Sequence, residues 1–281
     1  MFRFGVSQFT TTPWSFERDV EGYARLGVDA IEVCEEKLDE ERFAEQLKLV
    51  EERGLEISSV QPSVRTLYPS RTQPEPPGMA ERLALFRRAI ERVAPFAGDV
   101  PFVCNTGPPP EGDIRKVLEV AAREYRALAD FAGEHGGRVA LEPLSPALMN
   151  VESAIWTLGQ AMRVVAEADR DNFGICLDVW NVWQNPDVVE EIRGCAGRVF
   201  VMHVSDWRMP RSFADRHIVG RGEVPLPDLL RAVHESGYRG AYTLEIFSDG
   251  VPDSLWETDI SGVIAESRAG LEEAWGEAGL S

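Results

Sequence analysis

Cysteine is scarce in this chain of 281 residues: there are four, with no CxxC pair and no tight cluster. Such spacing gives no sign of a disulfide framework. Cys34, Cys104 and Cys176 lie in apolar stretches that have the pattern of strands. We therefore expect reduced thiols that pack as small apolar side chains.

Basic residues are also few, since 29 Lys and Arg stand against 47 Asp and Glu, for a formal net charge of −18. A nucleic acid or an anionic membrane surface needs a basic stripe, so we expect neither partner. No apolar run approaches the length of a membrane span, and the start MFRFGVSQF lacks the apolar core of a signal peptide. These absences predict a cytoplasmic protein.

Apolar strand patterns alternate with amphipathic helix patterns eight times, without a linker or a low-complexity tract. Strands that alternate with helices pair in parallel, and eight such units close into a (β/α)8 barrel. We therefore predict an α/β fold with one barrel domain over residues 1–281. An open doubly wound sheet is the alternative, but no glycine fingerprint follows the first strand. The expected strands cover residues 2–9, 28–34, 55–63, 100–107, 138–144, 173–180, 198–207 and 241–247.

Helix starts are predicted near Ser15, Asp39, Asp113 and Glu152. Between the third strand and the third helix lies VRTLYPSRTQPEPPGMAE, whose prolines forbid a regular element. An irregular segment of this length is typically a functional lid or a disordered linker. Because a helix follows at once, we expect a lid.

Each of the last four strands ends in an ionisable side chain, namely Glu142, Asp178, His203 and Glu245. Along a strand every second side chain faces the same way, so a small or apolar residue lies one layer below each of them. This arrangement fits a barrel interior that is packed at the bottom and functional at the top. A single acidic residue at a strand end is ordinarily solvated or paired with arginine, but four in the same phase favour one site.

Three carboxylates with no cation among them would repel one another when partly buried, so a bound cation is the simplest compensation. Carboxylate oxygens with one imidazole suit a divalent metal. Mn²⁺ is our first expectation, with Mg²⁺, Co²⁺, Fe²⁺ and Zn²⁺ as alternatives.

Several motifs resemble those of the sugar phosphate isomerase/epimerase superfamily, the xylose-isomerase-like barrels that include ketose 3-epimerases, inosose dehydratases and hydroxypyruvate isomerase. The similarity runs over the whole chain. The motifs that carry it are LEPL (141–144), LDVW (177–180), HVSD (203–206), DRHIVGRGEVPL (215–226) and LEIF (244–247).

The resemblance implies that Glu142, Asp178, His203 and Glu245 bind the metal and that Arg216 binds a substrate oxygen. It implies a sugar or sugar phosphate isomerase or epimerase, with Glu142 and Glu245 as the acid/base pair that forms and collapses a metal-stabilised enediolate. One departure concerns the position after DVW, where many members carry histidine and this chain has Asn181. An asparagine can hydrogen-bond a hydroxyl group but carries no proton at neutral pH.

Further polar and aromatic residues near the strand ends are candidates for substrate contact, because sugar hydroxyls need hydrogen-bond partners and sugar C–H faces pack on aromatic rings. Asp206 could instead orient His203. Ordinary loop hydrogen bonding or packing explains each of them equally well. These candidates are Glu32, Gln61, Asn105, Asp206, Trp14 and Trp180.

Other functions remain open at this point. The main alternative is a lyase of the same superfamily, acting on an inosose, a dehydroshikimate-like acid or an oxidised glycoside, and a remoter one is a non-catalytic sugar-binding barrel. With four histidines in total, the chain cannot build the multi-zinc centre of the related endonuclease IV. The resemblance also implies a homodimer or a homotetramer.

Overall fold

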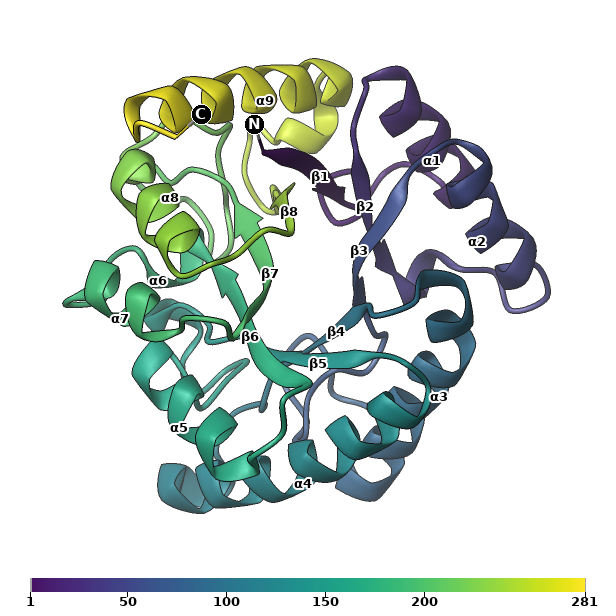
Figure 1. Ribbon diagram of the computed structural model, residues 1–281, viewed down its shortest axis with the longest axis vertical. Helices are drawn as coiled ribbons and strands as arrows, with labels where there is room; N and C mark the ends of the chain where they lie inside the picture. Colours follow the sequence, from purple (N-terminus) through teal and green to yellow (C-terminus); the bar gives the residue numbers. More distant parts are fainter. Residues whose placement is uncertain (1, 281) are drawn as a thin grey trace.

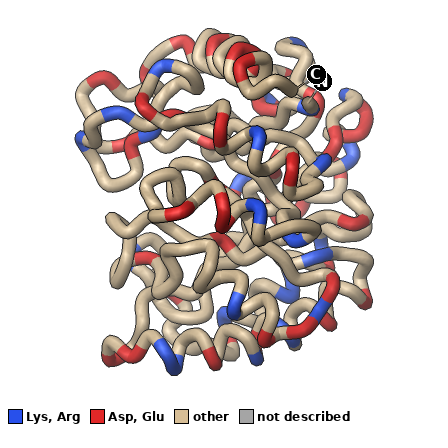
Figure 2. Tube along the Cα trace, turned by 60° about the vertical axis from the view of Figure 1, so that its left-hand side comes forward, with Lys and Arg blue, Asp and Glu red and all other residues tan. Residues whose placement is uncertain are grey.

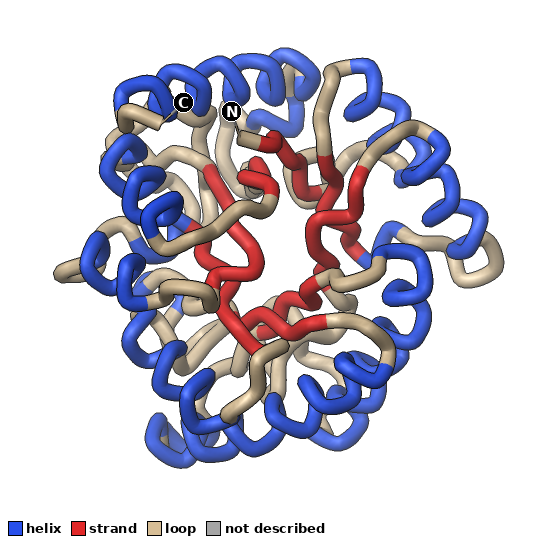
Figure 3. The backbone as a smooth tube through the Cα atoms, in the orientation of Figure 1, coloured by secondary structure: helices blue, strands red, loops and turns tan. Residues whose placement is uncertain are grey.

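In the computed structural model, which describes residues 2–280, eight parallel strands form a closed barrel in chain order. Figure 1 shows the ring of strands inside a ring of helices, with both chain ends beside α9, and Figure 3 separates the two layers by colour. The strands are β1 (Arg3–Ser7), β2 (Ala30–Cys34), β3 (Glu56–Gln61), β4 (Pro101–Cys104), β5 (Arg138–Leu141), β6 (Phe173–Asp178), β7 (Val199–Val204) and β8 (Ala241–Leu244). The predicted (β/α)8 barrel is confirmed.

The helices follow the predicted order, with an added short turn of helix, α6, directly after β6. The described residues also include four short 3₁₀ helices, η1 (Glu35–Lys37), η2 (Pro110–Gly112), η3 (Pro146–Leu148) and η4 (Leu255–Glu257). The α-helices are α1 (Phe16–Arg25), α2 (Phe43–Glu52), α3 (Met79–Ala97), α4 (Ile114–Glu134), α5 (Leu158–Ala168), α6 (Val179–Val182), α7 (Val188–Gly194), α8 (Leu226–Glu235) and α9 (Ile260–Glu277).

Capping residues explain where the helices begin. The side chains of Ser15 and Asp113 accept backbone N–H bonds at the starts of α1 and α4, as predicted. The predicted start near Glu152 is wrong, because Thr157 and Gln160 form a complete capping box that opens α5 five residues later. Asp39 caps the turn before α2, through the amides of Glu41 and Arg42, and not the helix itself.

Most of the core lies between the strands and the helices, and a smaller cluster fills the barrel interior. That interior layer contains Val103, Ala140, Cys176 and Val201, which are all nearly or fully buried. The four strands β4 to β7 each contribute one of these side chains. This layer is the packed floor on which the residues at the barrel mouth stand.

Charged residues are spread over the molecule. Figure 2 shows acidic and basic positions interspersed along the outer helices and loops in that view. Among residues 2–280, no helix combines the length and the apolar character that a membrane crossing requires.

Candidate metal centre and active site

Four donor groups lie at the carboxyl ends of consecutive strands. Asp178 is the last residue of β6 and His203 lies in β7, while Glu142 and Glu245 directly follow β5 and β8. The amides of Glu142 and Glu245 still donate to the neighbouring strands, at Cys104 O (2.9 Å) and Val204 O (3.1 Å). The sheet pairing therefore extends far enough to fix both glutamates.

A register shift between β6 and β7 sets two of these donors at the same height. Ile175 pairs with Val199, but Cys176 pairs with Val201, so Phe200 is an extra residue in β7. Above this bulge Asp178 pairs with His203, and both side chains face the interior. If the register continued unshifted from Ile175 and Val199, Asp178 would pair with Met202, whose side chain packs in the outer core.

The four donors converge. One ligand atom from each of Glu142, Asp178, His203 and Glu245 lies within 4.8 Å of the corresponding atom of every other, and all four side chains are buried. His203 Nδ1 is 3.3 Å from Glu245 Oε2 and 3.9 Å from Glu142 Oε1. Buried carboxylates gathered around an imidazole nitrogen suit a divalent metal ion. These residues therefore fit the metal that the sequence predicts.

The side chain of Arg216 places a cation among the carboxylates, where none was expected from the strand pattern. The guanidinium of Arg216 is 2.7 Å from Asp178 Oδ2 and 2.8 Å from Glu245 Oε2. It also lies over the rings of Trp180 and Phe247, at 5.1 and 5.0 Å from their centroids. The assumption of three carboxylates without a cation is thus wrong, because the loop after β7 folds back and places Arg216 between two of them.

Two asparagines hold the ligand carboxylates. Asn181 donates from Nδ2 to Asp178 Oδ2 (2.7 Å) and to Glu142 Oε1 (3.1 Å), and its own oxygen accepts the amide of Ser145. Asn105 donates to Glu142 Oε2 at 3.3 Å. In this chain the asparagine after DVW therefore orients two of the predicted metal ligands.

Glu32 lies beneath the site and not on the wall of the cavity. Its Oε2 is 2.9 Å from His203 Nε2 and accepts the hydroxyl of Ser59. The carboxylate of Glu32 holds the Nε2 proton, so Nδ1 is the nitrogen that faces the cluster. The structure thus corrects two predictions: Glu32 contacts the histidine and not the cavity, and it takes the orienting role expected of Asp206.

The surroundings set the protonation of the cluster. Burial alone would lower the pKa of His203, but Cys176, Glu245 and Glu32 raise it well above its ordinary value. Burial raises the pKa of Asp178 against the opposing charge of Arg216. For Glu245, burial is outweighed by His203 and Arg216, so the pKa of this carboxyl is lowered. Without a metal, the cluster is therefore balanced by a protonated imidazole and a guanidinium.

A cavity of about 610 Å³ opens above the cluster. Of the predicted substrate-contact residues, it is lined by Gln61, Asn105, Trp180, Asn181 and Arg216. Glu142 and Glu245 also reach its wall, so the predicted catalytic pair faces the space where a substrate would lie. The cavity is large enough for a small ligand.

One wall of this cavity comes from the segment predicted as a lid. Residues 65, 66 and 71–75 line it, and Arg82 fixes the segment from below by donating to the carbonyls of Thr66 (2.8 Å) and Pro76 (2.9 Å). Arg65 and Arg71 lie in this segment and line the cavity, as does Glu152, near which the sequence suggested only a helix start.

Two predicted substrate contacts lie elsewhere. Trp14 packs on α1, where Gly22 leaves room for the indole, and Arg18 lies 4.6 Å from the ring centroid. Asp206 accepts the backbone amides of Gly220, Gly222 and Val224 at 2.8–3.0 Å. Asp206 therefore organises the loop after β7.

The chain belongs to the xylose isomerase-like TIM barrel family, whose model matches residues 20–272. The family assignment agrees with the closed barrel and with the resemblance that the motifs indicated.

Curated relatives of this chain carry the names of enzymes. An inosose isomerase from Halalkalibacterium halodurans is 29% identical over 125 residues, which cover 43% of each chain. A 3-dehydroshikimate dehydratase from Pseudomonas aeruginosa is 26% identical over 244 residues, which cover 82% of this chain and 36% of the dehydratase. The match thus spans less than half the length of either relative.

Solved structures share the fold. A protein from Sinorhizobium meliloti 1021 superposes with a TM-score of 0.84 at 22% identity, over 97% of this chain and 98% of that one. A structure of D-psicose 3-epimerase in the presence of D-fructose gives a TM-score of 0.78 at 18% identity, over 99% of this chain and all of the other.

Proposed function

We propose that this chain is a divalent-metal-dependent isomerase or epimerase of a small sugar, sugar phosphate or polyol-derived carbonyl compound. The convergence of Glu142, Asp178, His203 and Glu245 below a cavity of about 610 Å³ carries the proposal. The enzyme names of its relatives support it.

Glu142, Asp178, His203 and Glu245 would hold the metal, for which Mn²⁺ is our first choice because three of the four donors are carboxylates. A divalent ion there would act as a Lewis acid that polarises the carbonyl of the substrate and acidifies the neighbouring C–H bond.

Proton transfer is assigned to the two glutamates at the cavity. Glu245 reaches the cavity directly after β8, which places its carboxylate where it would accept the proton from carbon. Glu142 reaches the cavity from β5, at a different point of the mouth. Removal by one carboxylate and return by the other gives epimerisation, whereas transfer by one carboxylate between adjacent carbons gives isomerisation.

The polar residues around the cavity would bind the substrate. Arg216 offers a guanidinium to an oxygen on the substrate, and Gln61, Asn105 and Asn181 offer amide groups to hydroxyls. Trp180 provides a flat apolar wall for the C–H face of a sugar.

A lyase is the second candidate. The match to 3-dehydroshikimate dehydratase covers 82% of this chain, more than the match to inosose isomerase. The same deprotonation next to a carbonyl yields elimination if a β-hydroxyl group then leaves. The amide of Asn181 cannot give up a proton at neutral pH. A leaving hydroxyl group would therefore take its proton from one of the glutamates.

The deciding experiment measures deuterium uptake from D₂O into a panel of ketoses, aldoses, inososes and dehydroshikimate, with Mn²⁺ present and with metal removed by chelation. We expect exchange with one class of compound, lost on chelation and reduced about 10²–10⁴-fold in Glu142→Gln and Glu245→Gln. Arg193→Met, which removes a half-exposed ion pair with Glu235 away from the cavity, is the control for general damage.

Product analysis separates the two candidates. A product with the same composition as the substrate identifies an epimerase if one carbon centre is inverted and an isomerase if the carbonyl group has moved. A product that has lost water identifies a lyase. A protein that binds no metal at one equivalent and exchanges no proton with any member of the panel would refute both.

A further inference from the structure

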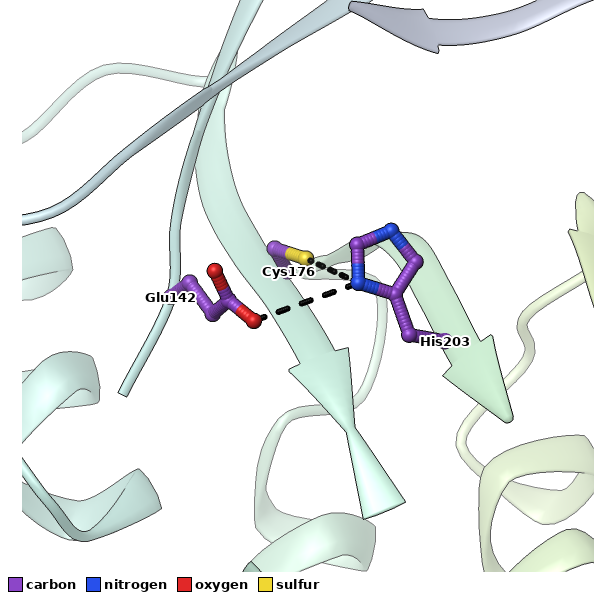
Figure 4. Close-up of side chains that lie close together, drawn as sticks. All are labelled: Glu142, Cys176 and His203. Atoms are coloured by element: carbon purple, nitrogen blue, oxygen red, sulfur yellow. Dashed lines mark hydrogen bonds and ion pairs between the residues drawn. The ribbon is translucent and has the colours of Figure 1, made fainter. Parts of the chain in front are cut away.

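Cys176, together with Glu142 and His203, forms a second set of donors directly beneath the predicted metal site. It precedes Asp178 by two residues on β6, so its side chain faces the same interior one layer deeper. The thiol is fully buried in the floor layer with Val103, Ala140 and Val201. Figure 4 shows its sulfur and the carboxylate of Glu142 directed at the same nitrogen of His203.

The three groups have the spacing of metal ligands. Cys176 Sγ lies 3.7 Å from His203 Nδ1, and Glu142 Oε1 lies 3.9 Å from the same atom. One donor atom of each lies within 4.8 Å of the others. Neighbouring ligands around a tetrahedral ion are separated by about 3.5 Å, given bond lengths of 2.0–2.3 Å.

The deeper set differs from the upper one in its charge balance. Arg216 pairs with Asp178 and Glu245 in the upper set, whereas its guanidinium forms no ion pair with Glu142 among the described residues. Both sets share Glu142 and His203, so one ion at a time can use them. The donors also differ in kind, because a thiolate is soft and carboxylate oxygens are hard.

We propose that Cys176, Glu142 and His203 form a second, deeper metal position that selects thiophilic divalent ions such as Zn²⁺ and Co²⁺ over Mn²⁺ and Mg²⁺. The inference rests on the proposed metal site, since it shares two of its ligands. Binding at this position releases two protons to solvent, one from the thiol of Cys176 and one from Nδ1 of the protonated His203. A thiophilic ion at the deeper position competes with the ion bound by the four upper donors.

The test is a titration of the metal-free protein with Co²⁺, followed by near-ultraviolet absorption and by equilibrium dialysis. Thiolate ligation produces a sulfur-to-cobalt charge-transfer band, which oxygen and nitrogen ligands do not give. We expect the band to saturate at one equivalent in the wild type and in Cys104→Ser, a buried strand cysteine outside the cluster. The band disappears in Cys176→Ser.

Competition dialysis gives the selectivity. In Cys176→Ser the preference for Zn²⁺ over Mn²⁺ falls at least about tenfold, the scale on which even indirect metal partners act. Mn²⁺ affinity stays unchanged, which shows that the upper donors are intact.

The outcomes separate this inference from the proposed function. Stoichiometric Co²⁺ binding without a charge-transfer band in the wild type overturns the deeper position and leaves the upper site standing. A band that persists in Cys176→Ser assigns the thiolate to another cysteine and also overturns it. If neither Co²⁺ nor Mn²⁺ binds, both proposals fail. The wild-type spectrum decides the first case even if the variant does not fold.

Discussion

The two halves of the barrel contribute different things to the mouth. From β5 to β8, every strand supplies one of the four converging donors. From β1 to β4, the strands supply Glu32 behind the histidine, Gln61 and Asn105 at the cavity, and the long segment that forms a wall. Under the proposed function, the second half would carry out the reaction, and the first half would support the metal ligands and shape the space for the substrate.

The sharpest test of this comparison sets Glu142→Gln against Gln61→Ala. Replacing a proton-transferring carboxylate should lower the exchange rate about 10²–10⁴-fold at saturating substrate. Replacing Gln61 should raise KM and leave kcat within a few-fold, because it removes a contact made equally in the ground state and the transition state. Steady-state exchange kinetics measure both. Equal losses in kcat for the two variants would break the division between the halves.

The next largest effect is the loss of stability expected when Arg216, in the second half of the barrel, is replaced. Arg216→Met leaves Asp178 and Glu245 buried without their partner, which should lower the free energy of unfolding of the metal-free protein by about 3–5 kcal/mol. Bound Mn²⁺ should restore part of the loss by supplying another cation.

Chemical denaturation with and without chelator measures this loss. Arg193→Met is the matched control, because both members of its ion pair with Glu235 are about half exposed and the pair should contribute below about 1 kcal/mol. A metal-free Arg216→Met protein as stable as the wild type would show that the carboxylates do not need this cation.

A smaller effect tests whether the first half supports the metal. Glu32→Gln keeps a hydrogen-bond acceptor for His203 Nε2 but removes the charge behind the imidazole. Metal affinity should fall about 10–100-fold, the usual cost of losing a carboxylate behind a ligating histidine. Isothermal titration with Mn²⁺ measures it, with Ser59→Ala as a control that removes only the hydroxyl bonded to Glu32. Unchanged affinity would reduce Glu32 to a packing role.

The smallest effect lies in the first half alone. Burial raises the pKa of Asp19 to about 6, although Lys37 lies 2.8 Å away. The carboxyl of Asp19 therefore stays protonated in the folded state at pH values where the unfolded chain, with a pKa of 3.8, has lost the proton. The contribution of Asp19 to stability is thus greatest at low pH and is lost as the pH rises through about 6.

This group alone should make the protein about 1.4 kcal/mol less stable at pH 7 than at pH 5. Denaturation of the wild type and of Asp19→Asn at both pH values measures the difference, because other titrating groups cancel between the two proteins. An identical pH dependence in both would show that Asp19 titrates normally.

Much of the site followed from local periodicity. The two-residue repeat placed Glu142, Asp178, His203 and Glu245 on interior faces, and strand order placed them at one end of the barrel. The same repeat placed Cys176 below Asp178, but its apolar surroundings pointed only to packing. Whether it also binds metal depends on its distance from His203, which the periodicity of one strand does not contain.

The contacts of residues in the loops were less predictable from the sequence. The motif around Arg216 pointed to a substrate contact, yet its partners Asp178 and Glu245 come from two other elements. Asp206 lies next to a strand end, as the predicted metal ligands do, but its carboxylate accepts hydrogen bonds from the backbone amides of the following loop. Trp14 follows the first strand, but its indole ring packs against Gly22 of α1.

By itself, the sequence determined the order of strands and helices, the closed barrel and the residues at its mouth, because these depend on patterns a few residues long. The tertiary structure decided which of those residues meet. Barrel closure brings Glu32 to His203 across 171 positions of the chain, and one extra residue in β7 sets Asp178 level with His203. Such contacts depend on the register between strands, which is fixed by packing over the whole barrel and not by any single strand.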